Sequence, residues 1–248
     1  LRGDPDRARR CATEGWGYLR CARHDEEMAP WFRDRATIIL ARTHALWGEW
    51  HQAHRYATQA LTHNTARGDT YGATDAHVTL AQACHGLGRY PEARAHAEKA
   101  LTQAESAGDL RLQGKALYVL TRAYVDGAQP ARAEPLVVDL LAIAEQTGDL
   151  EAYARGQLLR AQLLHRAGAL DAAEAILGPL LAKARAVGVP SYIVMALRQL
   201  AETRAAAGDF AGARASADEA QALAHRCRMR HELSYLAQLR ARLGEANG

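Results

Sequence analysis

The feature that most constrains the fold of this chain is a pattern of small residues that repeats every 40 positions. One series is a glycine followed by aspartate or valine, with the glycines at positions 68, 108, 148 and 188. A second series lies halfway between them, at Gly48, Gly88, Gly127-Ala128, Gly168 and Gly208. A fixed period in this range is typical of repeat architectures, in which each unit stacks on its neighbour. We therefore expect a solenoid.

The clearest unit, residues 69–108, indicates two helices per repeat. Asp69 can cap a helix by accepting hydrogen bonds from free backbone N–H groups, and Gly88 can end it in a left-handed conformation. Pro91 lies in the first turn of the second helix, where a missing N–H does no harm. The second helix is expected to end at Gly108.

The packing positions of this unit resemble those of the tetratricopeptide repeat family in their sizes. They are His77, Leu80, Ala81 and Cys84 on the first helix, and Ala93, Ala97 and Ala100 on the second. The resemblance implies an all-α fold, a right-handed α-solenoid of tetratricopeptide-like helix-turn-helix repeats. The longer helices are similar to those of bacterial regulatory proteins, such as ATPase-linked transcriptional activators and peptide-sensing regulators. The resemblance to this family thus implies a scaffold that binds protein or peptide.

Continuing this register predicts one array over residues 1–248, with about five to six repeats. Its expected parts are a half repeat at 1–22, full repeats at 29–67, 69–107, 109–147, 149–187 and 189–227, and a final helix at 229–243. Gly178-Pro179 falls inside a helix, where proline removes a hydrogen bond and is expected to cause a kink. Because the first residue is Leu1 and the first repeat is incomplete, we expect a piece of a longer protein, with flanking domains.

Charge and cysteine content limit the function classes. Lys and Arg number 31 against 28 Asp and Glu, a net charge of +3, which does not indicate general nucleic-acid binding. The four cysteines form no CxxC pair, so reduced thiols and a cytoplasmic location are expected, without a secretory leader or membrane anchor. Cys84 is expected to be a buried thiol in a packing stripe.

No motif in the sequence predicts catalysis or a cofactor. GxSxG, Walker-type and HExxH patterns are absent, so the chain is expected not to be an enzyme. His51 and His54 share a helix face, and His44 could join them. Without a carboxylate or cysteine to complete the set, solvated histidines are the preferred interpretation and no metal site is predicted.

A surface remains as the candidate site. In tetratricopeptide repeats the first helices line the concave side, and one stripe on these helices recurs in every unit. The candidate peptide-binding residues on that stripe are Arg35, Arg42, Gln82, Lys115, Tyr118, Arg122, Arg155, Leu158, Gln162, His165 and Arg198. Six are basic, and the acids assigned to the stripe are Asp75 and Glu202. The hypothesis is a groove that binds an acidic protein or peptide segment, with Tyr118 and Leu158 accepting an apolar side chain.

Three alternatives stay open at this point. The arginines could be a solvated face that keeps the array soluble. They could bind single-stranded nucleic acid, although few aromatic residues interleave with them to stack bases. The array could also be a structural module that associates with a second copy as a homodimer, or with a flanking domain of its own protein.

Overall fold

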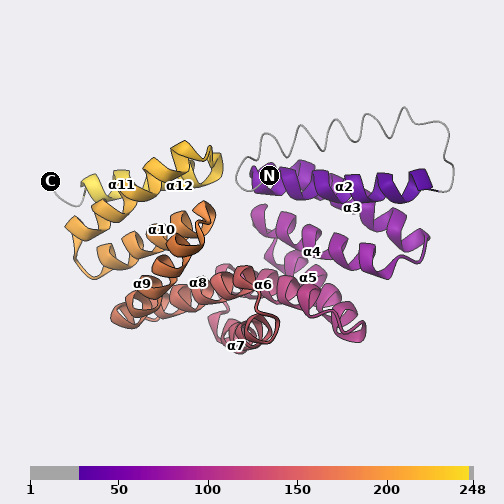
Figure 1. Cartoon of the computed structure of the whole chain (residues 1–248), viewed down its shortest axis with the longest axis horizontal. Helices are drawn as coiled ribbons and strands as arrows, with labels where there is room; N and C mark the ends of the chain where they lie inside the picture. The colour runs from indigo at the N-terminus through magenta and orange to yellow at the C-terminus, as the bar shows by residue number, and fades with distance from the viewer. Residues whose placement is uncertain (1–27, 246–248) are drawn as a thin grey trace. The chain divides into compact units, whose positions relative to one another are not determined.

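The computed structural model describes the backbone of residues 28–245 and the side chains of 35–229 and 232–244. The expected half repeat 1–22 lies outside this part. The described chain is all α-helical, and its helices follow one another as tetratricopeptide-like hairpins (Figure 1). We call the first helix of each pair A-type: α2 Met28–Leu46, α4 Thr70–Gly86, α6 Leu110–Asp126, α8 Leu150–Arg166, α10 Pro190–Ala206 and α12 Arg230–Glu245. The second helices are B-type: α3 Trp50–Ala66, α5 Tyr90–Ser106, α7 Pro130–Thr147, α9 Leu170–Val187 and α11 Phe210–Arg226.

The turns between these helices occur at the positions that the glycine pattern predicts. Each has one residue in the left-handed region, and these residues are spaced by 20 positions: Gly48, Gly68, Gly88, Gly108, Ala128, Gly148, Gly168, Gly188, Gly208 and Arg228. In the degenerate pair Gly127-Ala128, it is Ala128 that has positive φ, at 58°. The period of 40 thus consists of two helices that each occupy 20 residues with their turn.

The predicted caps are also present, and the prolines that interrupt the pattern lie within continuous helices. The Asp69 carboxylate accepts a hydrogen bond from the Gly72 N–H at 2.8 Å, and Asp109 and Asp149 cap α6 and α8 in the same way. Pro135 and Pro179 lie inside α7 and α9. The final helix expected at 229–243 is α12.

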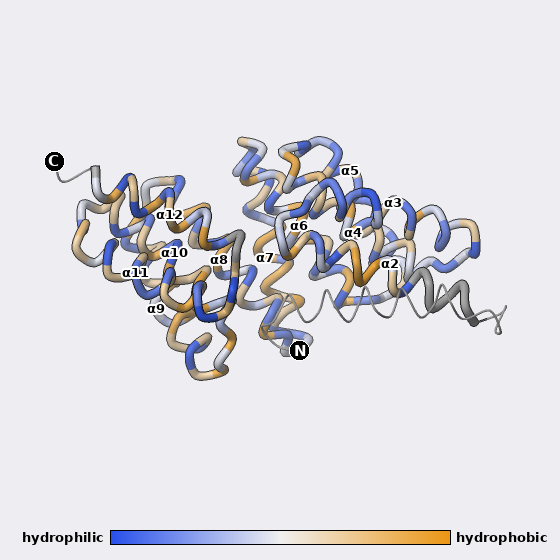
Figure 2. Tube along the Cα trace, turned by 90° about the horizontal axis from the view of Figure 1, so that it is seen from above, coloured by the Kyte–Doolittle hydropathy of each residue, from blue (hydrophilic) through white to orange (hydrophobic). Residues whose placement is uncertain are grey.

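The two helix types differ in how deeply they are buried. Every residue from Ala73 to Ala81 of α4 is buried, whereas α5 buries only Ala93, Ala97, Ala100 and Ala104. Successive A-type helices also contact one another, α2 with α4 and α4 with α6, and α8 with α10 and α10 with α12. Figure 2 shows hydrophobic and hydrophilic positions alternating along the helices, as expected when each helix buries one face. The A-type helices form the inner layer.

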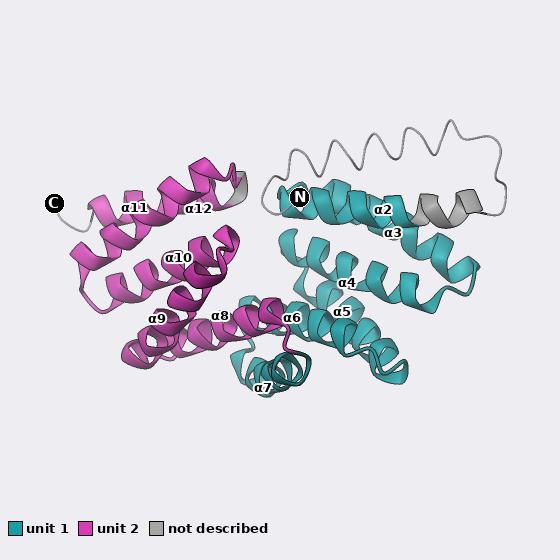
Figure 3. Cartoon of the chain, viewed as in Figure 1, with its two compact units in different colours: residues 1, 5–147 teal, residues 2–4, 148–248 magenta. Residues whose placement is uncertain are grey.

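The chain divides between Thr147 and Gly148 into two compact units (Figure 3). In its described part, unit 1 contains α2–α7 and unit 2 contains α8–α12. The core of unit 2 contains a cluster that includes Leu177, Leu197 and Leu236, and the described core of unit 1 includes Leu80, Leu117 and Leu140. A single array over the whole chain stays a prediction. No described helix has the length and apolar character needed to span a bilayer.

Candidate functional site

The candidate residues lie on the A-type helices, as the resemblance implies, but they differ in exposure. Arg35 is exposed, and Gln82, Lys115, Arg122, Arg155, Gln162, His165 and Arg198 are half-buried. The Arg42 side chain is 48% exposed. Tyr118 and Leu158 are buried, at 8% and 6% exposure. These two residues belong to the core and do not offer the open apolar surface that the sequence analysis assigned to them.

In unit 1, one buried carboxylate joins cations from two neighbouring helices. Asp75 on α4 lies 3.6 Å from Arg42 Nη1 on α2 and 3.6 Å from Lys115 Nζ on α6. Its side chain is only 5% exposed, so it depends on these cations to offset its lost hydration. Asp75 thus links the two neighbouring A-type helices α2 and α6 through one carboxylate.

Two further arginines of unit 1 lie over tyrosine rings. The Arg35 guanidinium carbon is 5.8 Å from the centre of the Tyr71 ring, and that of Arg122 is 5.7 Å from the Tyr118 ring. A ring beneath a guanidinium group fixes its position and leaves its N–H groups able to donate. Arg122 is held further by a hydrogen bond of 3.5 Å from its Nη1 to the Tyr118 hydroxyl.

His85 adds a polar link between α4 and α6. Its Nε2 lies 2.8 Å from the Asp126 carboxylate. Burial lowers the pKa of His85, the hydrogen bond to Asp126 opposes this, and the charge of Arg122 adds to the lowering. Among the residues of this face whose side chains the structure describes, unit 1 has the four cations Arg35, Arg42, Lys115 and Arg122 and the two carboxylates of Asp75 and Asp126.

In unit 2, the candidate arginines Arg155 and Arg198 both form ion pairs with carboxylates of the described residues. Arg155 pairs with Glu151 one turn earlier on α8. Arg198 lies 3.3 Å from Glu232 of α12 and 3.7 Å from Glu202. Two arginines thus face three carboxylates, and the hydroxyl of Tyr235 donates to Glu202 as well. The continuous basic stripe expected from the sequence is basic only in unit 1.

Polar side chains beside the candidate residues Leu158 and His165 connect helices of unit 2 to one another. The Gln199 amide donates to the Leu158 backbone carbonyl at 3.1 Å, which ties α10 to α8. The Thr203 hydroxyl lies 3.3 Å from His165 Nδ1 across the same pair of helices. These contacts give His165 a structural role.

The sequence analysis missed the carboxylates that neutralise this face. Asp126 and Glu232 escape the 40-residue pattern because the equivalent positions, such as Gly86 and Tyr192, are not acidic. Glu151 could have been found, since Glu and Arg four residues apart on a helix commonly form an ion pair. The contribution of each half of the chain to the net charge of the face therefore required the structure.

Comparison with known proteins agrees with this fold. Residues 73–146, which cover α4–α7, match the tetratricopeptide repeat family model. The chain resembles the crystal structure of BtubC (BKLC) from P. vanneervenii, with a TM-score of 0.66 and 18% identity over 90% of this chain and 92% of that chain. No curated protein sequence matches it.

Two further solved structures share the fold over a smaller share of their own length. A Rap protein complexed with Competence and Sporulation Factor aligns with a TM-score of 0.63 and 13% identity, over 86% of this chain and 65% of that chain. Aspartyl phosphate phosphatase F from Bacillus subtilis aligns with a TM-score of 0.59 and 16% identity, over 87% of this chain and 60% of that chain. At these identities the likeness shows the fold alone.

Proposed function

We propose that the A-type face of unit 1 binds an acidic segment of a protein or peptide. The chain would serve as a non-catalytic interaction or sensory domain of a larger bacterial regulatory protein. The observation that supports this most is the gathering of Arg35 and Arg42 on α2 and of Lys115 and Arg122 on α6, on either side of Asp75 of α4. The Arg42 side chain is 48% exposed, and its five N–H donors can meet a ligand carboxylate as well as Asp75. Gln82, half-buried on α4, is an additional donor on this face.

The tyrosines of this face favour a carboxylate ligand over stacked nucleobases. Tyr71 is 44% exposed but has Arg35 over its ring, and Tyr118 is buried beneath Arg122. Proteins that bind single strands without sequence preference present aromatic faces on which bases stack. With the rings already covered by guanidinium groups, the face presents forked N–H donors instead.

The regulatory part of the proposal rests on the fold. Helical repeats build extended surfaces suited to binding chain segments. The Rap structure is titled as a complex with Competence and Sporulation Factor, so a related fold holds a signalling molecule in that protein. The phosphatase name belongs to the Bacillus subtilis protein. We keep the prediction that the present chain acts by binding.

The test compares two double variants with the same loss of charge. Arg35→Ala with Arg122→Ala removes two tyrosine-stacked arginines from A-type helices of unit 1. Arg55→Ala with Arg132→Ala removes two from B-type helices, where they lie 4.9 Å and 5.8 Å from the centres of the Tyr56 and Tyr124 rings. The probe is a set of fluorescent peptides with Asp or Glu at graded spacing, measured by fluorescence anisotropy.

The A-type double variant should bind the best peptide about tenfold more weakly, because it loses two partly screened charge contacts. The B-type variant should bind like the parent chain. If both variants lose the same affinity for the peptide, the effect is due to net charge alone, and the binding site is not on the A-type face. A labelled oligodeoxythymidine tests the alternative. If it binds with an affinity that falls steeply with salt, and no peptide binds, the chain binds single-stranded nucleic acid and the proposal is wrong.

A further inference from the structure

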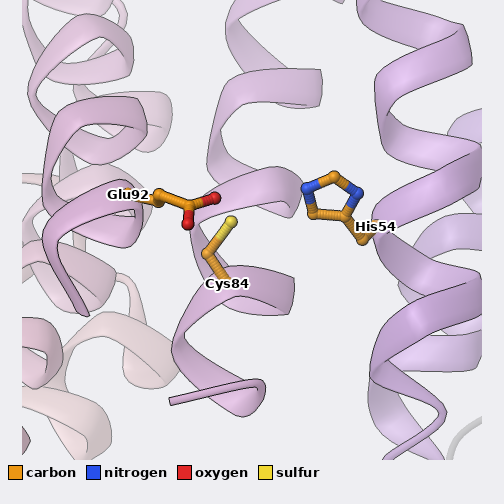
Figure 4. A group of neighbouring side chains, drawn as sticks. All are labelled: His54, Cys84 and Glu92. Carbon is orange, nitrogen blue, oxygen red and sulfur yellow. The ribbon is translucent and has the colours of Figure 1, made fainter. Parts of the chain in front are cut away.

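Three potential metal ligands come together in unit 1, away from the stripe of candidate residues. They are His54 on α3, Cys84 on α4 and Glu92 on α5, and their ligand atoms all lie within 4.8 Å of one another. Figure 4 shows the Cys84 sulfur between the Glu92 carboxylate and the His54 ring, each from a different helix. From the sequence alone, His54 is interpreted as a solvated histidine and Cys84 as a buried thiol, because no carboxylate or cysteine near His54 in the sequence completes a ligand set.

Packing fixes the central ligand. Cys84 is fully buried and lies in a small cluster with Ala93 of α5 and Ala123 of α6. His54 is half-buried and Glu92 is exposed, so these two side chains can adjust. Zinc bonds of about 2.0–2.3 Å place tetrahedral ligand atoms about 3.3–3.7 Å apart, so an inward movement of about 1 Å closes the set. Side-chain rotation at His54 and Glu92 can supply this movement.

The donor set selects the class of metal. Thiolate, imidazole and carboxylate together are the ligands of zinc and its neighbours, whereas calcium and magnesium take oxygen ligands. We propose that His54, Cys84 and Glu92 bind a zinc ion, with a fourth position open to solvent on the Glu92 side. This site goes beyond the proposed function, and either can fail without the other.

Zinc binding at this site has to displace a proton from the buried thiol of Cys84. Burial raises the pKa of Cys84 to about 11, with a further increase from Glu92 and a partial decrease from Arg89. Without a metal the thiol therefore keeps its proton at neutral pH. A bound zinc ion displaces that proton and offsets the negative charges of the thiolate and of Glu92.

A pair of histidines, His77 and His96, lies on α4 and α5 near the proposed site. His96 is one turn beyond Glu92 on α5, and His77 is two turns before Cys84 on α4. Their Nδ1 atoms are 3.0 Å apart, so one of the two must lack a proton there to accept the hydrogen bond. The two imidazoles are thus bonded to each other and are separate from the proposed ligand set.

The test uses cobalt(II) as a spectroscopic substitute for zinc. A variant of the full chain in which Cys11, Cys21 and Cys227 are replaced by Ser keeps Cys84 as its single thiol. After treatment with a chelator, this variant should bind one cobalt ion with a thiolate charge-transfer band, and zinc should displace it. Adding Cys84→Ser should abolish the band.

The other ligands have matched controls. His54→Ala and Glu92→Gln should each weaken cobalt binding by about tenfold or more. His51→Ala removes an exposed imidazole from the same helix and should leave the affinity unchanged. The proposal is wrong if the single-thiol variant has native helical circular dichroism but no charge-transfer band. It is also wrong if His51→Ala reduces the affinity as much as His54→Ala.

Discussion

At the scale of single residues, Ala128 has a backbone conformation that suits glycine. Its φ of 58° lies in the left-handed region, which eight glycines occupy at equivalent turns. A side chain in that region costs roughly 1–2 kcal/mol, because Cβ approaches the following carbonyl oxygen. The chain retains this strain between α6 and α7.

We expect Ala128→Gly to raise the free energy of unfolding by about 0.5–1 kcal/mol. The relief of backbone strain in the folded state outweighs the greater conformational entropy that glycine gives to the unfolded chain. Urea unfolding followed by circular dichroism measures it. The control is Ala107→Gly, at a helix end where φ is −87°. That change relieves no strain and should not stabilise the chain; equal stabilisation by both would contradict the explanation.

His77 is a titratable residue in a packing position. Burial lowers its pKa to about 4, and the charges of His96 and Lys99 add to the effect. Because the unfolded chain binds this proton near the ordinary pKa of 6.5, the stability from the neutral imidazole is present above that pH. It is lost as the pH falls toward about 4. Burial also lowers the pKa of its partner His96.

The equivalent positions in two other A-type helices hold Leu117 and Leu197, so His77→Leu is a substitution that the fold already uses. Between about pH 7 and about pH 5, the free energy of unfolding should fall less in the variant than in the parent chain. The reason is that the variant lacks the histidine whose protonation is suppressed in the folded state. Urea titrations at both values measure this difference. His51→Leu, at an exposed position, should keep the parent's dependence on pH. An unchanged dependence in His77→Leu would assign the effect to other groups.

At the scale of helices, small residues set the distance within each pair. Ala93 is fully buried where α5 meets α4, beside Cys84. Ala93→Leu should destabilise the chain by about 1–3 kcal/mol, because the added methyl groups have no space without moving the helices apart. Chemical denaturation measures the loss.

Ala95→Leu is the control for this prediction, because it makes the same change on the exposed side of the same helix. It should alter the free energy of unfolding by no more than about 0.5 kcal/mol. A similar loss at both positions would mean that helix propensity, and not packing, decides the result.

The helices were predictable because local rules repeat. Gly88 ends α4 and the Asp69 carboxylate caps it, as the spacing indicated, and Ala93 and Ala97 are buried as expected. The candidate face was less predictable. Its net charge depends on Asp126 and Glu232, which pair across helices at positions that the repeat does not share.

At the scale of the molecule, a uniform sequence pattern produces two units with different faces. The inner helices of unit 1 have a cation excess, whereas Glu151, Glu202 and Glu232 offset Arg155 and Arg198 in unit 2. A repeat pattern predicts equivalent backbones, but ion pairs depend on individual side chains. The search for a ligand should therefore begin with α2, α4 and α6.

The even spacing of the left-handed turn residues has an evolutionary consequence. Removing one residue within a helix would rotate the rest of that helix by about 100°, which would bring polar residues into the core. Removing a whole helix would join two helices of the same type and leave an inner face without its outer partner. Viable insertions and deletions are thus confined to the turns or to complete pairs of helices, so that this protein can change its length by recombination in steps of 40 residues while its local packing is preserved.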